Sequence, residues 1–236
     1  MMTPRLLHAK LEDKLVHNPK HTQFMFELIQ PHQLEFMAGQ YVSIKINDRG
    51  ERRSYSICSS PNIKHGFELL VDLEPQGQGS QYLQSLQFGD QIDFLAPLGQ
   101  FIIASDNQET VMMMVASGSG IAPFRSMIQD LLQEKRDTRT IILHWGMRFA
   151  NQLFWLDELE DLMDNFPNFT FHPVISQPSP EWTLSRGRVT DVLKMIDLPV
   201  QTGYYLCGSQ PMIIDCQEIL KARGVAQDLI HYEKFY

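Results

Sequence analysis

The sequence has few cysteines, no excess of positive charge and no long apolar run. Its three cysteines, Cys58, Cys207 and Cys216, lie far apart in a chain of 236 residues. An odd number at such spacing suits neither a disulfide framework nor a four-thiolate metal or iron-sulfur site. We therefore expect no metal site, and any redox chemistry must depend on an organic cofactor.

The charge and hydropathy of the chain exclude further classes of partner. A formal net charge of -8 provides no cationic surface for phosphate backbones or anionic lipids. No stretch reaches transmembrane length, and the first residues lack an apolar run followed by a small-residue cleavage site. These absences predict a cytoplasmic protein that binds neither nucleic acid nor membrane, and we expect a monomer.

What is present divides into two halves with different periodicity. Before about residue 105, short β-like runs such as 40–46 and 67–71 alternate with turn signals. Apolar residues spaced at three and four predict one short helix near 80–86. This rhythm is typical of a small antiparallel barrel.

After residue 105, continuous apolar runs alternate with helical periodicity. The expected strands, each with the helix that follows it, are 111–115 with 122–132, 140–145 with 152–163, 169–174 with 190–196, and 203–207 with 211–222. Four such units predict an α/β domain with a parallel sheet. The polar segment 105–109 separates the halves, so we expect domains at 1–105 and 106–236.

A glycine-rich loop connects the first of these strands to its helix, with the sequence Gly118-Ser119-Gly120-Ile121-Ala122-Pro123. Glycines let backbone N–H groups approach a pyrophosphate, and a helix N-terminus adds partial positive charge. The loop departs from G-x-G-x-x-G because Pro123 occupies the third glycine position. The alternative is a tight turn without a ligand, which is the commoner outcome for an isolated G-x-G.

A second motif, Arg53-Ser54-Tyr55-Ser56, lies at the end of an expected barrel strand. An arginine can neutralise a diphosphate, an aromatic ring can lie against a flavin, and a hydroxyl can hydrogen-bond a ring nitrogen. Alternation along the strand puts Arg53 and Tyr55 on the same face. An amphipathic strand with a surface arginine is the alternative.

Together the two motifs resemble the ferredoxin-NADP reductase superfamily, in which R-x-Y-S binds flavin and G-x-G-I-A-P binds the nicotinamide dinucleotide. The resemblance covers essentially the whole chain and implies a six-stranded antiparallel flavin-binding barrel followed by a parallel-sheet α/β nicotinamide-dinucleotide domain. Further segments that fit the family in the same order are Gly89-Asp90 with 96–101, 145–148, 207–212 and the tail 232–236.

The resemblance implies that the first domain binds FAD. The residues that would contact this cofactor are Arg53, Ser54, Tyr55, Ser56, Leu70, Val71, Asp72, Gly77, Gln78, Gly79 and Ser80. Leu70 and Val71 as barrel core and Ser80 as a helix N-cap are the structural alternatives, and they are compatible with FAD because such contacts are largely made by backbone.

The C-terminal tail offers Phe235 and Tyr236 as aromatic rings to cover the flavin, and Glu233 as a carboxylate near the nicotinamide. Glu233 stands three residues before Tyr236, whereas the plant-type ending places its glutamate two residues before the last tyrosine. The offset leaves open which aromatic ring stacks. A frayed polar tail is the alternative.

For the second domain the resemblance implies a site for NADPH or NADH. The phosphates would lie on Gly118, Ser119, Gly120, Ile121, Ala122 and Pro123, in a groove lined by Gly146, Met147, Arg148, Cys207, Gly208, Pro211 and Met212. Ser176 with Arg186 or Arg188 could meet a 2′-phosphate, or these residues could be solvated loop positions, so the coenzyme stays open. Cys58 and Cys216 are expected in the core.

The implied activity is NAD(P)H oxidoreduction, in which hydride passes from nicotinamide C4 to flavin N5 and electrons then leave singly. The candidate catalytic residues are Ser56 near N5, Cys207 at the nicotinamide, and Glu233 for orientation or proton supply. Because no C-x4-C-x2-C cluster is present, the acceptor is expected to be a separate protein, such as a ferredoxin or an oxygenase component. The alternatives are a flavin reductase that uses free flavin as substrate and a non-catalytic electron-transfer subunit.

Overall fold

The computed structural model describes residues 3–74, 76–104 and 108–235, apart from the side chain of Phe235. Residue contacts divide the chain into two units that interleave in sequence. Unit 1 comprises Met1–Ile103 and Ala122–Lys135, and unit 2 comprises Ala104–Ile121 and Arg136–Tyr236. The expected domain boundary at residues 105–106 lies outside the described residues. The segment 122–135, expected in the second domain, clusters with the first.

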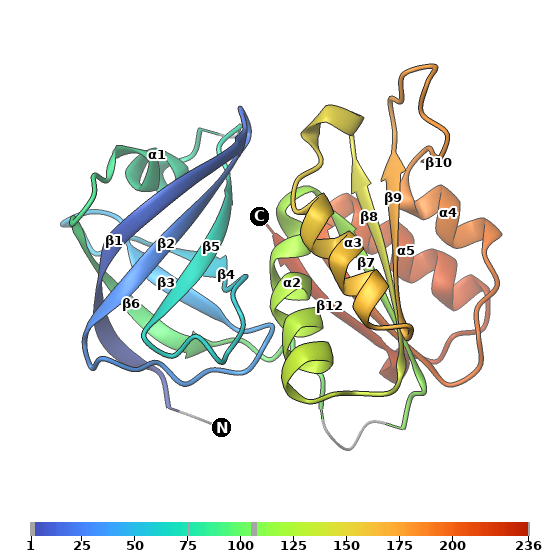
Figure 1. The fold of residues 1–236 in the computed structure, drawn as a ribbon, viewed down its shortest axis with the longest axis horizontal. Helices are drawn as coiled ribbons and strands as arrows, with labels where there is room; N and C mark the ends of the chain where they lie inside the picture. The colour runs from blue at the N-terminus through green and yellow to red at the C-terminus, as the bar shows by residue number, and fades with distance from the viewer. Residues whose placement is uncertain (1–2, 75, 105–107, 236) are drawn as a thin grey trace. The chain divides into compact units, whose positions relative to one another are not determined.

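Unit 1 is built on an antiparallel sheet of six strands, as expected (Figure 1). The strands are β1 (Arg5–Asn18), β2 (His21–Gln30), β3 (Tyr41–Lys45), β4 (Arg52–Ser56), β5 (Gly66–Asp72) and β6 (Gln91–Leu98). Their order is β4-β3-β6-β1-β2-β5, so β4 and β5 are the edge strands. An isolated antiparallel bridge between Ile57 and Leu69 joins the two edges and closes the sheet into a barrel.

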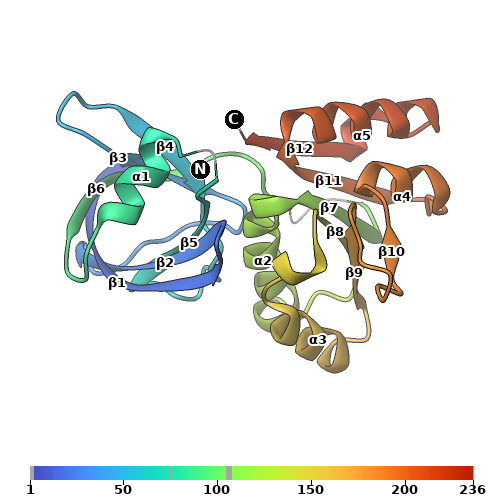
Figure 2. The same cartoon turned by 90° about the horizontal axis from the view of Figure 1, so that it is seen from above.

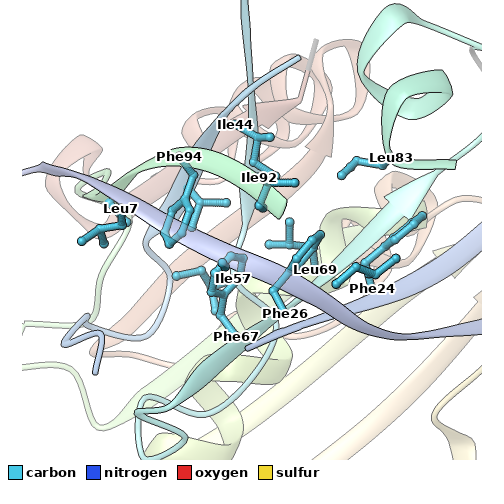
Figure 3. Close-up of a cluster of buried hydrophobic side chains, with 14 of the residues drawn as sticks. Leu7, Phe24, Phe26, Ile44, Ile57, Phe67, Leu69, Leu83, Ile92 and Phe94 are labelled. Atoms are coloured by element: carbon cyan, nitrogen blue, oxygen red, sulfur yellow. The ribbon is translucent and has the colours of Figure 1, made fainter. Parts of the chain in front are cut away.

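The barrel interior is filled by apolar side chains from alternate strand positions (Figure 3). Phe26 and Phe67 stack with their ring centroids 5.3 Å apart, and Phe67 meets Phe94 at 4.8 Å. Ile44 and Leu69 are fully buried beside them. This inward-facing set is why the first half of the sequence carries a strand-like period.

Helix α1 (Gln78–Ser85) covers one end of the barrel (Figure 1). It places Leu83 in the barrel core. At its C-terminal end, the Nζ of Lys14 on β1 donates to the carbonyl oxygens of Gln84, at 2.8 Å, and Leu86. A cation there complements the partial negative charge of the helix end. The expected helix near 80–86 is confirmed, with its start two residues earlier.

Helix α2 (Ala122–Gln129) and the π-helical turn that follows it (Asp130–Glu134) also belong to unit 1. The ring of Phe124 packs edge-on against Phe101 of the barrel, with centroids 5.8 Å apart. A Cβ on Gly39 would lie 1.9 Å from the Phe101 carbonyl oxygen and 2.3 Å from Met127 Cε. Only glycine therefore allows this close approach between the helix and the barrel.

Unit 2 contains a parallel sheet of six strands (Figure 2). The strands are β7 (Val111–Ser117), β8 (Thr140–Met147), β9 (Phe169–Ile175), β10 (Ser185–Arg186), β11 (Thr202–Ser209) and β12 (Ile230–Phe235). Their order is β10-β9-β8-β7-β11-β12, so the direction of strand order reverses between β7 and β11. The four expected strands are confirmed. The tail, for which fraying was the alternative, forms β12.

The described residues of unit 2 also form three α-helices: α3 (Leu156–Asn165), α4 (Val189–Met195) and α5 (Gln210–Ala222). Figure 2 shows α4 and α5 on one face of the sheet and α3 on the other. On the α3 side, Trp145 of β8 is fully buried and its ring meets Phe154 at 4.9 Å. The longest helix in the described part of the chain is α5, with 13 residues, and no described helix is long and apolar enough to cross a membrane.

Candidate functional site

The motif on β4 and the start of α1 come together in unit 1. Arg53 Nη2 donates to Gln78 Oε1 at 3.3 Å. A Cβ added to Gly79 would lie 2.3 Å from Tyr55 Oη and 2.8 Å from Arg53 Cγ. Glycine therefore lets the first turn of α1 rest directly on these two side chains, which share one side of β4 as alternation predicts.

The four residues of this motif differ in exposure. Arg53 and Ser54 are exposed, Tyr55 is half-buried, and Ser56 is buried. Burial raises the pKa of Tyr55 to about 12, so its phenol stays protonated and can donate a hydrogen bond. An exposed guanidinium, a neutral phenol and the N-terminus of a helix form a site suited to an anionic group carried next to an aromatic ring.

The start of α1 differs from the expected cap. Gly77 is the N-cap residue and makes no side-chain cap hydrogen bond. The Ser80 hydroxyl lies inside the helix and donates to the Gly77 carbonyl oxygen at 3.0 Å, so the interpretation of Ser80 as an N-cap is wrong. The first N–H groups of α1 thus have no side-chain cap as partner, as a helix N-terminus that receives an anion requires.

The second candidate segment of unit 1 lies on the edge strand β5. Leu70 and Val71 are buried, and Asp72 is half-buried. The Val71 side chain belongs to the barrel core, whereas Leu70 is buried on the opposite face of β5, as alternation along a strand requires, so the interpretation as barrel core holds for Val71 and is wrong for Leu70. Asp72 Oδ1 accepts a hydrogen bond from the backbone of Glu74 at 2.9 Å, which fixes the turn after the strand.

In unit 2 the candidate residues gather at the carboxyl ends of β7 and β11. These neighbouring strands flank the reversal of strand order, where open α/β sheets place their ligands. The backbone N–H of Ser209 donates to Ser117 Oγ at 3.3 Å and ties the two ends together. Gly118 adopts a left-handed φ of +55° and begins a 3-10 turn over Gly118–Ile121, and Ala122 and Pro123 then open α2.

The glycines of this edge are required by packing within the protein. A Cβ on Gly120 would lie 2.3 Å from the Cys207 carbonyl oxygen. A Cβ on Gly208 would lie 2.3 Å from Ser117 Oγ and 2.8 Å from Met212 Cε. The sequence argument explained these glycines by ligand approach or by a tight turn, and the structure adds that the loop lies directly on the end of β11. Any ligand must bind to a surface that is preformed by these contacts.

Cys207 and Glu233, far apart in sequence, face each other across β11 and β12. Cys207 is fully buried, and this burial, followed by the nearby Glu233 carboxylate, raises the pKa of its thiol well above the usual value. The residue is therefore a neutral thiol at physiological pH and can act only by packing. Glu233 is half-buried on a strand, so the frayed-tail alternative is wrong for this part of the tail.

The ends of β8 and β9 carry the next group of candidates. A Cβ on Gly146 would lie 2.9 Å from Val189 Cγ1, so this glycine also allows close packing. Met147 is buried, and its carbonyl oxygen accepts the backbone N–H of the exposed Ser176 at 3.0 Å. Arg148 is exposed, and its Nε donates to Gln177 Oε1 at 3.2 Å.

Arg186 was a candidate for a phosphate and is exposed, but it already has partners within unit 2. Its Nη2 donates to the Pro180 carbonyl oxygen at 3.1 Å and to that of Trp182. Phe149, missed by the sequence argument, carries the Arg148 guanidinium over its ring at 5.3 Å. The one sequence signal that could have identified Phe149 as a site residue was its position directly after the 145–148 segment.

The remaining candidates lie on α5 and at the chain end. Pro211 and Met212 occupy the first turn of α5, where Met212 is buried and its sulfur lies 3.5 Å from Cys216 Sγ. Cys58 and Cys216 are both fully buried, so the prediction that they belong to the core is confirmed. The Phe235 side chain and Tyr236 lie outside the described residues.

Two family models match the chain. Residues 8–103 match the oxidoreductase FAD-binding domain, and residues 114–218 match the oxidoreductase NAD-binding domain. The first range covers the strands of the barrel, and the second covers β7 to β11 together with most of α5. The two matches follow the same order as the two kinds of sheet.

Among curated proteins, the chain is similar to the anthranilate 1,2-dioxygenase electron transfer component of Acinetobacter baylyi, at 32% identity over 205 residues, covering 86% of this chain and 59% of that protein. It is 35% identical over 210 residues to the phenol hydroxylase P5 protein of Acinetobacter pittii, covering 86% and 58%. The chain thus spans less than two thirds of the length of these relatives.

Among solved structures, the Amycolatopsis cytochrome P450 reductase GcoB superposes with a TM-score of 0.88 at 26% identity, covering 98% of this chain and 70% of that one. A ferredoxin NADP+ reductase from Neisseria gonorrhoeae with bound FAD and NADP gives a TM-score of 0.85 at 24% identity, covering 98% and 99%. At that identity the second likeness concerns the fold alone.

Proposed function

Because the chain belongs to the ferredoxin-NADP reductase superfamily, with an FAD-binding and an NAD-binding domain, we propose that it oxidises a nicotinamide coenzyme and passes the electrons to a separate one-electron acceptor. The observation that supports this proposal is that one chain has two close-packed glycine contacts of different design, each at a proposed nucleotide site. One lies where Arg53 and Tyr55 meet Gly79, and the other where Gly120 meets Cys207.

FAD, when bound, supplies the redox chemistry, since it accepts a hydride and releases electrons one at a time. The barrel residues supply its binding and orientation. Arg53 would neutralise the diphosphate together with the N-terminus of α1, and Tyr55 would lie against the cofactor with its protonated phenol as a donor. Ser56 is buried at the end of β4, where its hydroxyl would hydrogen-bond the flavin ring.

The residues of unit 2 supply the coenzyme site. Backbone N–H groups of the Gly118–Ile121 turn would hold the phosphates at the reversal of strand order. Cys207, neutral and buried, would pack behind the nicotinamide and exclude water. Glu233, opposite Cys207 on β12, would orient the carboxamide or hold a proton at its carboxyl oxygens.

We infer that NADH is the preferred coenzyme. A 2′-phosphate needs a guanidinium that is ready to form paired hydrogen bonds. Arg186 already donates to two loop carbonyls, and Arg148 already donates to Gln177. Binding a 2′-phosphate at Arg186 or Arg148 would therefore first break contacts within unit 2. Arg188, the other candidate, occupies the N-cap of α4, where its backbone N–H donates to Asp191 Oδ2 at 2.9 Å.

The acceptor is proposed from the relatives and from the charge of one hairpin. The two curated relatives described above are an electron transfer component of a dioxygenase and a protein of a phenol hydroxylase. An oxygenase component or a ferredoxin-like protein is accordingly the proposed partner here. The β3–β4 hairpin carries Lys45, Arg49 and Arg52 against Asp48 and Glu51, a small local excess of positive charge that would favour an acidic partner, although the whole chain carries a net charge of -8.

The proposal is tested by the visible spectrum of the purified chain, supplied with FAD and titrated anaerobically with NADH and then NADPH. We expect the protein to hold FAD through gel filtration, and NADH to bleach it at lower concentration than NADPH. A chain that binds no FAD and supports no bleaching would refute the proposal.

The same titration separates the two alternatives. FAD that is reduced but leaves the protein on gel filtration would indicate a flavin reductase. FAD that stays bound but is not reduced by either coenzyme would indicate a non-catalytic electron-transfer subunit. The contact of Tyr55 and Arg53 with Gly79 favours retained FAD, because it preforms a site on the barrel.

A further inference from the structure

The barrel is closed along a seam formed by Ile57, Cys58, Glu68 and Leu69. Ile57 bridges Leu69, and the Cys58 N–H donates to the Glu68 carbonyl oxygen at 2.9 Å. Both segments proposed to hold FAD end here. Arg53–Ser56 comes directly before the seam on β4, and Leu70–Asp72 comes directly after it on β5. The geometry of the seam therefore sets the spacing between the two FAD-contacting segments.

In this seam, an arginine side chain donates a hydrogen bond that a backbone N–H would donate in a regular antiparallel pair. In an antiparallel hydrogen-bonded pair, each residue donates its N–H to the carbonyl of the other. The Glu68 N–H instead donates to Ser59 Oγ at 3.1 Å. The Cys58 carbonyl oxygen accepts from Arg125 Nη1 at 3.0 Å. A side chain of α2 thus takes the place of a backbone donor.

The same guanidinium nitrogen also binds the other side of the seam. Arg125 Nη1 lies 2.8 Å from Glu68 Oε2, in a pair whose side chains are only 13% and 20% exposed. Glu68 Oε2 also accepts from Gln23 Nε2 at 2.9 Å, which fixes the carboxylate from β2. Arg125 therefore connects the chain beyond β4 to a carboxylate that is itself held by the barrel.

We propose that Arg125 is a positioning residue for FAD, acting by clamping the seam between β4 and β5. The inference rests on the proposed FAD site on these strands. Without the guanidinium, the Cys58 carbonyl and the mostly buried Glu68 carboxylate lose a shared donor, and the carboxylate loses its counter-charge. The strand ends then separate more easily, and FAD must reassemble the site when it binds, which weakens its affinity.

The test compares R125M, which removes the donors, with R125K, which keeps a positive charge. R139M is the matched control, because Arg139 is 20% exposed and binds Asp137 in unit 2. FAD affinity of the apoprotein is measured by quenching of flavin fluorescence. We expect R125M to weaken FAD binding roughly 10- to 100-fold, R125K to weaken it about threefold to tenfold, and R139M to leave it unchanged.

A second readout separates clamping from a general loss of stability. Amide hydrogen exchange at Cys58 and Glu68, whose N–H groups donate at the seam, should become faster in R125M, while exchange at Leu11, in the barrel core on β1, stays as in the wild type. A folded R125M with wild-type FAD affinity and wild-type exchange at Cys58 would overturn the inference. If R125M does not fold because the Glu68 carboxylate is left unpaired, the double variant R125M/E68Q replaces it, and wild-type FAD affinity with wild-type exchange at Cys58 in that variant would overturn the inference equally.

The proposed function and the clamp fail in different ways. A wild-type chain that binds no FAD refutes the proposed function, and the exchange rate of the Cys58 amide then decides alone whether Arg125 holds the seam. A wild-type chain that binds FAD, together with an unaffected R125M, refutes the clamp and leaves the proposed function standing.

Discussion

The two units form their proposed nucleotide sites with different parts of the chain. In the barrel, the site is shaped by the side chains of Arg53 and Tyr55, which meet Gly79. In the parallel sheet it is shaped by backbone, because Gly120 lies against the Cys207 carbonyl. The flexible end of a side chain can move aside, whereas a carbonyl inside a sheet cannot. The barrel site should therefore tolerate substitution, and the sheet site should not.

The largest effect is expected from G120A. Its Cβ would lie 2.3 Å from the Cys207 carbonyl oxygen and 2.7 Å from Gly208 Cα, and neither atom can shift without distorting β11. We expect unit 2 to lose about 3 kcal/mol or more of stability and coenzyme reduction of FAD to be abolished. All three tryptophans, 145, 155 and 182, lie in unit 2, so their fluorescence follows its unfolding.

G118A is the matched variant for this prediction. Gly118 has a φ of +55°, but a Cβ there meets nothing within 4 Å. G118A should therefore lose only the stability that the strained left-handed conformation costs, about 1 to 2 kcal/mol. Both variants should retain FAD binding by unit 1. Equal losses of stability in G118A and G120A would contradict the backbone contact as the cause.

A smaller effect in unit 2 is expected from acid. His144 is buried on β8 and its ring stacks on His172 at 5.0 Å. Burial, followed by the nearby His172, lowers the pKa of His144 from 6.5 to about 4. As pH falls below 6.5, His144 becomes protonated in the unfolded chain but stays neutral in the folded chain. The free energy of unfolding therefore declines until about pH 4.

Between pH 7.5 and pH 5.0 this histidine should reduce the unfolding free energy of unit 2 by about 2 kcal/mol. The measurement is urea unfolding followed by tryptophan fluorescence at both pH values. The variant H144F, which keeps a ring but cannot titrate, should lose that part of the pH dependence. The same pH dependence in H144F and in the wild type would show that His144 is not the cause.

The smallest effect is expected from G79A, the barrel counterpart of G120A. Its Cβ would meet Tyr55 Oη at 2.3 Å, and this side-chain atom can turn away. Because alanine favours a helix over glycine by up to about 1 kcal/mol, the apoprotein should be as stable as the wild type or more so. FAD affinity should fall about tenfold, since Tyr55 is displaced from its place against the cofactor.

The double variant Y55F/G79A tests the cause of that loss. Removing the Tyr55 hydroxyl removes the nearest atom that the new methyl group would meet and leaves Arg53 Cγ at 2.8 Å as the remaining close contact. Adding G79A to Y55F should therefore weaken FAD binding less than adding G79A to the wild type does. A fully additive loss would show that Tyr55 Oη and the Gly79 position act independently.

Much of the fold could be predicted from the sequence because buried positions recur in it with the period of a strand or a helix. The strands β7 and β11 are buried along almost their whole length and are rich in apolar residues, as a strand covered on both faces should be. The edge strand β12 lacks this signal, because Tyr232 is exposed and Glu233 and Lys234 are only half-buried. Its place is set by pairing with β11, and the sequence of the tail does not encode that partner.

The candidate site could be predicted in part for a similar reason. Motif spacing indicated that Gly118 and Arg53 lie near strand ends, where the structure has them. The contacts of Gly120 with Cys207 and of Arg125 with Cys58 join residues that are distant in sequence. Local periodicity reports which face of an element is buried, but not against which partner, so neither contact could be anticipated.

The interleaving of the two units has a consequence for how such a protein can be recombined. The chain passes between the units at residues 103–104, 121–122 and 135–136. A chimaera joined at the linker between the two family domains would take the barrel from one parent and α2 from the other. Phe101 and Glu68 would then face a foreign helix in place of Phe124 and Arg125. Parents that exchange domains successfully must therefore already agree at these four positions.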